Sequence, residues 1–390
     1  MNARRKIRFG IIGLGLMGRE FGSAIARWSH LLFDGPVPEL VGVCDTNEKS
    51  HAWFTESFPA LRMATRNYEE LLDSSAIDAI YCAVPHNLHE KLYGDIVRAG
   101  KHLMGEKPFG IDRKANAAIL AAIAEKPGLF VRCSSEYPYF PGALRLVSWI
   151  QEGRFGRIME VRAGFHHSSD MDVRKPVNWK RVIEFCGEYG CMGDLGIHTQ
   201  HIPFRVGWKP KSVYASLSKI VTERPDGKGG MAPCQTWDNA TLACAVDHRD
   251  GYTFPLFLET KRMAPGMTNT WYIEVDGLKA SARFSTREPK TFYYLLSGGE
   301  APFGLPAKEQ AWCRLDLGYT PAVPAITGGI FEFGFPDAIL QMWAAFLLEM
   351  ESGAPPVFGC FTPEETRISH ALQTAALESH RKGSVEPVAV

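Results

Sequence analysis

Apolar runs and amphipathic segments alternate along the first 130 residues of the chain. The amphipathic segments repeat apolar residues three and four positions apart, which predicts helices, and short apolar runs separate them. This alternation is typical of β-α units around a parallel sheet. We therefore expect an α/β domain over residues 1–130. Its predicted strands cover 7–12, 40–44, 79–84, 102–105 and 129–132, and its predicted helices include 19–30, 68–72 and 88–99.

After residue 150 the pattern changes to alternating apolar and polar positions, rich in β-branched and aromatic residues. This alternation predicts a mostly antiparallel sheet with one solvated face. We expect an α+β domain over 131–390, with a last helix over 363–380 that begins after Thr362 and packs back towards the first domain. The strand-like segments are 158–165, 212–221, 240–248, 253–263 and 270–284, and 224–230 and 302–309 are predicted loops.

The first strand runs into the sequence GLGLMG, in which Gly13, Gly15 and Gly18 form a G-x-G-x-x-G motif. A strand precedes the motif and a helix opens within it at about Met17, which is the setting that a dinucleotide site requires. Gly13 permits the tight turn, Gly15 lets the backbone approach a pyrophosphate, and Gly18 lets the helix pack on the strand. The helix amino terminus offers N–H groups to the phosphates.

The second strand ends in CDTN, which places Asp45 where a carboxylate can bind the adenosine ribose hydroxyls. The spacing from Gly13 is longer than the usual ~20 residues, and we assign the difference to the segment LFDGPVPE. Thr46, rather than an arginine, follows the acid. This favours NAD over NADP, whose 2′-phosphate needs a cationic partner.

Two later strand ends carry polar residues at the edge where open α/β sheets bind ligands. AVPHNLHE follows the third predicted strand and brings His86 and His89. GEKPFG follows the fourth and brings Glu106 and Lys107 before Pro108, a proline that restricts the preceding backbone. Lys107 is therefore a candidate for electrostatic stabilisation and proton handling.

A third polar stretch, GDLGIHTQH, places Asp194, His198 and His201 on one face of a predicted helix. An aspartate one turn before a histidine can orient the imidazole and stabilise its charged form, which suits the histidine to act as a base. The two H-x-x-H pairs could suggest a metal site. Neither has H-E-x-x-H spacing and no cysteine pair assists them, so no metal is expected.

The composition favours a small-molecule partner. A length of 390 residues predicts two domains. The 43 basic and 43 acidic residues cancel, which gives no electrostatic reason to expect nucleic acid or an anionic membrane. Nine scattered cysteines without a C-x-x-C pair predict reduced thiols in a cytoplasmic protein. We do not expect the basic residues before the first apolar run to be an export signal, because that run is short and cleavage there would remove the glycine motif.

Taken together, these motifs resemble the Gfo/Idh/MocA family, named after glucose-fructose oxidoreductase, inositol dehydrogenase and rhizopine-catabolism proteins. The resemblance rests on GLGLMG, CDTN, AVPHNLHE, GEKPFG and GDLGIH in the family's order, and covers nearly the whole chain. It implies an amino-terminal Rossmann domain, a second domain whose open sheet makes homo-oligomer contacts in a dimer or tetramer, and NAD(P)-dependent chemistry on sugars or cyclitols. It also implies Lys107 as the catalytic lysine and Asp194 and His198 as the catalytic pair.

The chain departs from the family's pattern at three positions. His86 stands where asparagine is frequent, and His201 where aspartate is frequent. Pro138 takes the place of an arginine in SSEYPYFPG, although Tyr139 and Pro141 match. These differences concern substrate contacts rather than the chemistry.

The expected function is therefore NAD-dependent hydride transfer from a secondary ring hydroxyl of a sugar, anhydrosugar or cyclitol. His198 would take the hydroxyl proton, Lys107 would stabilise the oxygen, and Asp194 would orient His198. Two alternatives remain open: an NAD-dependent glycosidase or lyase that oxidises a sugar transiently, and a non-catalytic NAD-binding sensor. The expected substrate contacts are Lys107, Tyr139, Trp179, Asp194, His198 and His201, and the expected cofactor contacts are Gly13, Gly15, Leu16, Met17, Gly18, Asp45, Thr46, Ala83, Pro85, His86, His89, Glu106 and Lys107.

Overall fold

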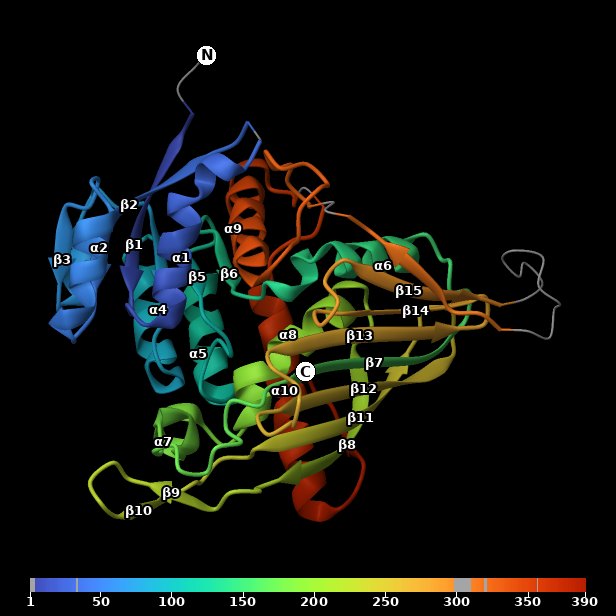
Figure 1. The fold of residues 1–390 in the computed structure, drawn as a ribbon. Helices are drawn as coiled ribbons and strands as arrows, with labels where there is room; N and C mark the ends of the chain where they lie inside the picture. Colours follow the sequence, from blue (N-terminus) through green and yellow to red (C-terminus); the bar gives the residue numbers. More distant parts are fainter. Residues whose placement is uncertain (1–3, 33, 298–309, 319–320, 356) are drawn as a thin grey trace. The chain divides into compact units, whose positions relative to one another are not determined.

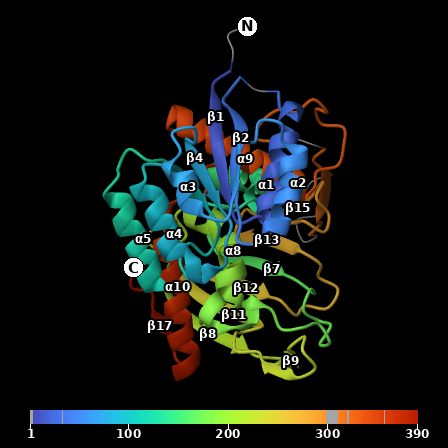
Figure 2. The same cartoon turned by 90° about the vertical axis from the view of Figure 1, so that its left-hand side faces the viewer.

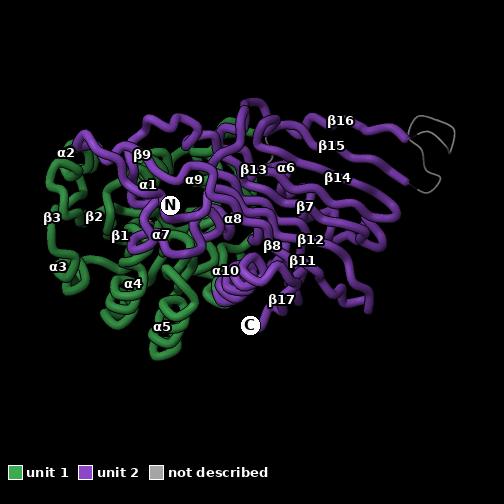
Figure 3. Tube along the Cα trace, turned by 90° about the horizontal axis from the view of Figure 1, so that it is seen from below, with its two compact units in different colours: residues 1–139, 321–328, 334–366 green, residues 140–320, 329–333, 367–390 purple. Residues whose placement is uncertain are grey.

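A computed structural model describes residues 4–32, 34–297, 310–318, 321–355 and 357–390 (Figure 1). The chain divides into two compact units, coloured separately in Figure 3. Unit 1 comprises residues 1–139, 321–328 and 334–366, and unit 2 comprises 140–320, 329–333 and 367–390. The predicted loop 302–309 lies outside the described residues. Within the described parts of the chain, no helix is both long enough and apolar enough to cross a bilayer.

Unit 1 contains the predicted parallel sheet. Its six strands lie in the order β3-β2-β1-β4-β5-β6, which is the doubly wound order of a dinucleotide-binding domain. Helices α3, α4 and α5 cover one side of the strands, and α1, α2 and α9 cover the other (Figure 2). The strands are β1 (Lys6–Ile12), β2 (Val37–Cys44), β3 (Met63–Thr65), β4 (Ala79–Cys82), β5 (His102–Gly105) and β6 (Val131–Cys133), and the helices are α1 (Leu16–Ala26), α2 (His51–Ser57), α3 (Tyr68–Asp73), α4 (His89–Arg98), α5 (Arg113–Ala124) and α9 (Phe335–Ser352).

Helix α9 is the main difference from the predicted domain boundary. The sequence analysis assigned 131–390 to the second domain, whereas residues 131–139 and α9 belong to unit 1. The reason is hydrophobic packing: the ring of Trp343 stacks on Phe21 with centroids 3.6 Å apart and meets Phe9 and Tyr81 edge-on. These four residues are buried. A helix from the end of the chain thus completes the core of the first domain.

Unit 2 is built on a mixed sheet of nine strands in the order β16-β15-β14-β13-β7-β12-β11-β8-β17. All pairings are antiparallel except that of β7 with β12, which agrees with the predicted mostly antiparallel sheet. The strands are β7 (Ile158–His166), β8 (Pro210–Ser218), β11 (Asn239–Asp247), β12 (Thr253–Lys261), β13 (Thr270–Gly277), β14 (Ala280–Ser285), β15 (Thr291–Leu296), β16 (Cys313–Asp316) and β17 (Glu386–Pro387).

Helices cover one face of this sheet. Helix α8 (Cys191–Arg205) packs on the middle strands and α6 (Pro141–Gln151) packs on β14 and β15. The buried residues of β12 alternate with half-buried or exposed ones, so the opposite face stays open. Unit 2 also holds the short helix α7 (Ile183–Cys186), the hairpin β9 (Glu223–Pro225) and β10 (Met231–Pro233), and most of α10 (Pro363–Lys382).

Local caps fix the ends of two helices. Gly100 follows α4 with φ +77°, a conformation that favours glycine. The amide of Glu365 donates to the Thr362 hydroxyl oxygen at 3.1 Å, and the amide of Thr362 donates to the Glu365 carboxylate at 2.8 Å. This reciprocal pair is a capping box, and it starts α10 at Pro363, directly after Thr362 as predicted.

Candidate active site

The turn between β1 and α1 is so tight that two of its three glycines cannot carry a side chain. Gly13 has φ +94°, and a Cβ on it would lie 2.3 Å from the carbonyl oxygen of Ala83. A Cβ on Gly18 would lie 2.3 Å from the carbonyl oxygen of Gly13. A Cβ on Gly15, by contrast, would meet nothing within 4 Å. The fold itself therefore needs Gly13 and Gly18, while Gly15 faces open space at the start of α1.

Asp45 holds this turn from the end of β2. One carboxylate oxygen accepts from the amide of Leu14 at 2.8 Å, and the other accepts from the amide of Asn47 at 2.8 Å. Helix α1 begins at Leu16 without a side-chain cap, and the Leu16 side chain is exposed. The uncapped amides and the open space at Gly15 fit a pyrophosphate, and Asp45 lies at the strand end where a ribose is expected. Nearby, Met17 is half-buried and Thr46 is exposed.

His89 connects the ends of β4 and β5. Its Nδ1 accepts from the amide of Gly110 at 3.3 Å, and its Nε2 lies 3.1 Å from the carbonyl oxygen of Val84. This pattern assigns the proton of a neutral ring to Nε2. The ring is fully buried and stacks on Tyr93. His89 therefore positions the loop. Ala83 and Pro85 are half-buried and remain accessible as predicted cofactor contacts, whereas His86 is buried.

Lys107 follows β5 and is half-buried among carboxyl groups of unit 1. Glu106 is buried and accepts from the Tyr81 hydroxyl at 2.7 Å. Burial, and then the charge of Glu106, raise the pKa of Glu136 to about 8, although the cationic Lys107 acts in the opposite direction. The charge of Lys107 thus acts on Glu136, a buried carboxyl group whose pKa is raised. The Lys107–Pro108 peptide is cis.

In unit 2, α8 carries the three predicted polar residues, and all of them are buried. Asp194 and His198 are one turn apart on this helix, and His201 follows almost one turn later. The indole Nε1 of Trp271, on β13, donates to the carbonyl oxygen of His198 at 2.8 Å. The ring of Phe165, on β7, meets the imidazole edge-on with centroids 5.2 Å apart. Two strands of the sheet thus fix the position of His198.

Two cations bind the same oxygen of Asp194. The Lys180 ammonium lies 3.0 Å from Oδ2, and both Nε and Nη2 of Arg262 lie 3.3 Å from it. Asp194 and Arg262 each have side chains that are 3 % exposed, whereas Lys180 is 40 % exposed. Burial alone would lower the pKa of Arg262, but the charge of Asp194, together with contributions from the thiols of Cys186 and Cys191, raises that pKa. The pair is a buried ion pair with a second, accessible cation at its margin.

The segment that carries Trp179 and Lys180 is anchored by buried arginines. Trp179–Arg181 forms a single turn of 3₁₀ helix, and Asn178 caps it by accepting from the amide of Lys180 at 3.0 Å. The fully buried guanidinium of Arg181 binds the carboxylates of Asp170 and Asp238. These contacts hold Trp179 half-buried with the Lys180 ammonium 5.7 Å from its ring centroid. Residues 178–181 are thereby fixed in unit 2, and we call them the substrate arm because they include the predicted substrate contact Trp179.

One predicted substrate contact is a core residue. Tyr139 is 0 % exposed, belongs to the hydrophobic core of unit 1, and packs edge-on against Phe358. Its hydroxyl lies 3.5 Å from the Cys360 sulfur. No exposed surface remains on Tyr139 for a substrate, so we correct its role to packing. Lys107 belongs to unit 1, and Trp179, Asp194, His198 and His201 belong to unit 2.

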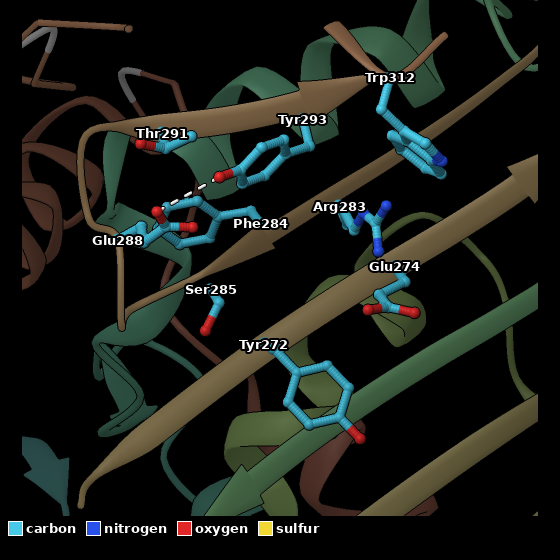
Figure 4. A pocket seen from close by; sticks show the side chains of 9 residues that line it. All are labelled: Tyr272, Glu274, Arg283, Phe284, Ser285, Glu288, Thr291, Tyr293 and Trp312. Atoms are coloured by element: carbon cyan, nitrogen blue, oxygen red, sulfur yellow. Dashed lines mark hydrogen bonds between the residues drawn. The ribbon is translucent and has the colours of Figure 1, made fainter. Parts of the chain in front are cut away.

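A hollow of about 420 Å³ lies on the open face of the sheet, away from α8 (Figure 4). The strand register places Tyr272, Glu274, Arg283 and Tyr293 on this face. Trp312 covers the Arg283 guanidinium at 3.8 Å from the ring centroid. None of the predicted catalytic residues lines the hollow, so it does not belong to the candidate active site.

Comparisons with known proteins match both units. Residues 7–134 match the model of an oxidoreductase family with an NAD-binding Rossmann fold, and residues 143–283 match the GFO/IDH/MocA carboxy-terminal domain. The two matches cover most of the chain in the expected order. The chain belongs to the Gfo/Idh/MocA oxidoreductase family. The glycine turn therefore belongs to an NAD-binding Rossmann domain, as predicted.

Relatives in the Gfo/Idh/MocA family include enzymes that act on sugars. Levoglucosan dehydrogenase from Pseudarthrobacter phenanthrenivorans is 25% identical over 58% of this chain and 57% of its own length. D-xylose dehydrogenase from Paenarthrobacter nicotinovorans is 26% identical over 49% of this chain and 48% of its own. The chain thus spans about half the length of these two relatives.

Solved structures confirm the fold over the whole chain. Levoglucosan dehydrogenase without ligands superposes with a TM-score of 0.87 at 21% identity, over 99% of both chains. The same enzyme in complex with NADH and levoglucosan gives a TM-score of 0.86 at 21% identity, over 99% of this chain and 100% of that one. At this identity the likeness shows the fold, and the substrate of this family member has to be argued from its own residues.

Sequence reasoning missed Lys180, Arg181 and Arg262. A signal for Arg262 is present in the alternation of β12, because residues 254, 256, 258 and 260 face the helices and position 262 continues that register. A charged residue at such an inward position indicates a buried ion pair. Lys180 and Arg181 lie in an irregular segment without a hydrophobic period. The sequence therefore does not indicate that Arg181 is buried and Lys180 accessible.

Proposed function

We propose that the protein is an NAD-dependent dehydrogenase that oxidises a secondary ring hydroxyl of a sugar, anhydrosugar or cyclitol. The observation that carries this proposal is the buried Asp194, bound by two cations one helical turn before His198. A carboxylate in this position can orient the imidazole and stabilise its protonated form, which suits His198 to act as a base near neutral pH. The sugar dehydrogenases among the relatives support the substrate class.

The cofactor would be held by the glycine turn, by Asp45 and by the ends of β4 and β5. NAD, when bound, supplies the acceptor for the hydride that leaves the substrate carbon. Backbone amides at Gly15 and Leu16 would bind the pyrophosphate, and Asp45 would accept from the ribose hydroxyls. The absence of a basic residue directly after Asp45 supports NAD rather than NADP.

The protein's own residues would handle the proton and the developing charge. As the C–H bond breaks, an imidazole nitrogen of His198 would accept the proton of the reacting hydroxyl, which leaves a carbonyl group on the product. Lys107 would donate a hydrogen bond to the same oxygen and stabilise its negative charge. Asp194 would orient the imidazole and stabilise its protonated form.

The test is turnover in active-site variants that still bind the cofactor. We expect Lys107→Met and His198→Asn to lower kcat by about 10²–10⁴-fold, the usual range for a general acid or base. NADH binding, followed by fluorescence, should stay within a few-fold of wild type. Lys114→Met, on the exposed surface of α5, is the matched control. Wild-type turnover in both active-site variants would refute the assignment.

The same assay separates the two alternatives. A glycosidase or lyase regenerates its bound NAD, so sugar cleavage would proceed without net NADH formation. A sensor would bind NAD and a sugar without turnover of either. Screening monosaccharides, anhydrosugars and inositols for NADH formation, with product analysis of the same mixtures, distinguishes all three.

We further propose that the protein is a cytoplasmic homo-oligomer that associates through the open face of the sheet. Tyr214 on β8 is 47% exposed and Trp312 beside the hollow is 42% exposed. Exposed aromatic residues on a flat sheet are typical of interfaces. The nine free thiols support a reducing compartment. Light scattering should show a dimer or tetramer, and Tyr214→Glu with Trp312→Glu should shift it to monomer; a wild-type monomer would refute this.

A further inference from the structure

Arg262 stands directly after β12 and is almost fully buried. Its backbone amide donates to the carbonyl oxygen of Asp238 at 3.0 Å, which fixes the residue to β11. Its side chain points to the helical face of the sheet, as do the alternate residues of β12 before it. A guanidinium in such a place requires a counter-charge and hydrogen-bond acceptors.

The guanidinium meets three parts of the candidate site at once. Nε and Nη2 bind Asp194 Oδ2 at 3.3 Å, Nη1 donates to the carbonyl oxygen of Lys180 at 3.0 Å, and Nη2 also lies 3.4 Å from the carbonyl oxygen of Gly190. Lys180 belongs to the substrate arm, and Gly190 is the residue before α8. One side chain therefore ties the catalytic carboxylate, the substrate arm and the start of the catalytic helix.

The two cations on Asp194 are not equivalent. Lys180 is 40 % exposed, so water or a ligand can compete for its ammonium group. Arg262 is 3 % exposed and is held by backbone carbonyls on two sides. When the Lys180 side chain turns away, Asp194 is still paired with the cationic Arg262. When Arg262 is removed, Asp194 depends on a single lysine at the solvent margin.

We propose that Arg262 is a positioning residue for the reaction: it keeps Asp194 ionised and in place, so that Asp194 can orient His198. The proposal rests on the proposed dehydrogenase function for its kinetic consequence, but the coupling between Arg262 and Asp194 is a property of the fold. A purely structural arginine would hold the arm and the helix without affecting the ionisation of Asp194. The two roles give different pH profiles.

The chain offers a matched control in Arg224. This arginine is also 2% exposed, and its side chain donates to the carbonyl oxygens of Asp170 and Asp172, which precede the substrate arm. Among the described residues, none of these hydrogen bonds of Arg224 involves Asp194. Arg224→Met therefore removes a buried arginine that supports the same loop and leaves the charge next to Asp194 in place.

The kinetic experiment measures kcat/KM against pH for wild type, Arg262→Met, Arg262→Lys and Arg224→Met, with the substrate that the polyol screen identifies. We expect Arg262→Met to lower kcat by about 10²-fold or more, and to move the acidic limb of the profile upwards by about one pH unit, since a missing cation makes protonation of the carboxylate easier. Arg262→Lys keeps the positive charge, so its acidic limb should lie close to the wild-type pH. Arg224→Met should leave it in place.

A second readout does not depend on turnover. Urea unfolding of wild type, Arg262→Met, Asp194→Asn and the double variant forms a double-mutant cycle. We expect Asp194→Asn to be markedly less destabilising in the Arg262→Met background than in wild type, because the buried carboxylate has then already lost its counter-charge.

The outcomes separate the two hypotheses. Additive unfolding energies, or an acidic limb that stays where it is in Arg262→Met, would overturn the positioning role. Should Arg262→Met not fold, Arg262→Gln, which removes the charge but keeps hydrogen-bond donors, replaces it in the same cycle with Asp194→Asn. Strong coupling in a wild-type protein that oxidises no polyol would leave the Arg262–Asp194 link intact and refute the dehydrogenase function instead.

Discussion

Gly13 and Gly15 stand two residues apart in one motif, yet the structure predicts opposite effects when each becomes alanine. At Gly13 the backbone has φ +94°, which costs an alanine about 1–2 kcal/mol. Its Cβ would also lie 2.3 Å from the carbonyl oxygen of Ala83, a backbone atom that cannot rotate away. We therefore expect Gly13→Ala to lower the free energy of unfolding by roughly 2–4 kcal/mol, in the range of buried backbone clashes.

At Gly15 the backbone is extended with φ −70°, and a Cβ would meet no atom within 4 Å. Gly15→Ala should consequently leave the free energy of unfolding within about 0.5 kcal/mol of wild type. The added methyl group would occupy the space in which the pyrophosphate is expected. Overpacking by one methyl typically costs about 1–3 kcal/mol, so we expect the Kd for NADH to rise roughly 5- to 150-fold.

The assay combines urea unfolding, followed by circular dichroism, with NADH titration followed by fluorescence. Each variant serves as the control of the other, because both add one methyl group to the same turn. The reasoning fails if Gly15→Ala binds NADH as tightly as wild type, or if Gly13→Ala unfolds at the wild-type urea concentration. Loss of stability in both variants would show that the open space at Gly15 is filled by the protein itself.

Three further predictions use single contacts. Asp45→Asn should weaken NADH binding in the same titration and lower the ratio of the Kd for NADPH to the Kd for NADH. It should also destabilise the turn, because Asp45 accepts from the amide of Leu14. The pKa of Glu136 is raised from 4.5 to about 8, so its folded-state advantage is present at low pH and is lost as pH rises through 8. The free energy of unfolding of wild type should therefore fall between about pH 5 and 8, by up to about 1.4 kcal/mol per pH unit, and that of Glu136→Gln should fall less. Thr362→Ala removes the capping box with Glu365 and should cost about 1 kcal/mol in unfolding experiments.

Periodicity was sufficient for most strands, because the central strands of unit 1 are buried on both faces and the long strands of unit 2 on one. It missed β3, which is short and not buried, and also β15, β16 and β17. Helix α9 could not be placed in the same way. Its apolar residues predict a buried helix, but nothing local states that Trp343 stacks on Phe21, more than 300 residues earlier in the chain. The strand ends that carry Asp45 and Lys107 followed from topology, since the carboxyl ends of parallel strands share one edge.

Some of the predicted site residues are enclosed by the protein and others face accessible space. The sequence alone does not show which residues belong to which group. Tyr139 and His89 carry chemistry-bearing groups, but each is fully buried and bonded within unit 1, so each supports the fold. Gly15, a predicted cofactor contact, and Lys180, which was not predicted, both face accessible space.

This division has a consequence for mutagenesis. Substitutions at positions without room for a change, such as Gly13, His89 and Arg181, should change stability first and binding only through the lost fold. Substitutions at positions that face open space, Gly15 and Lys180, should change binding at constant stability. Arg262 belongs to neither class, because it is enclosed and yet acts on Asp194. A variant there should change both stability and the pH profile, which makes it the position where a structural and a functional role can be measured together.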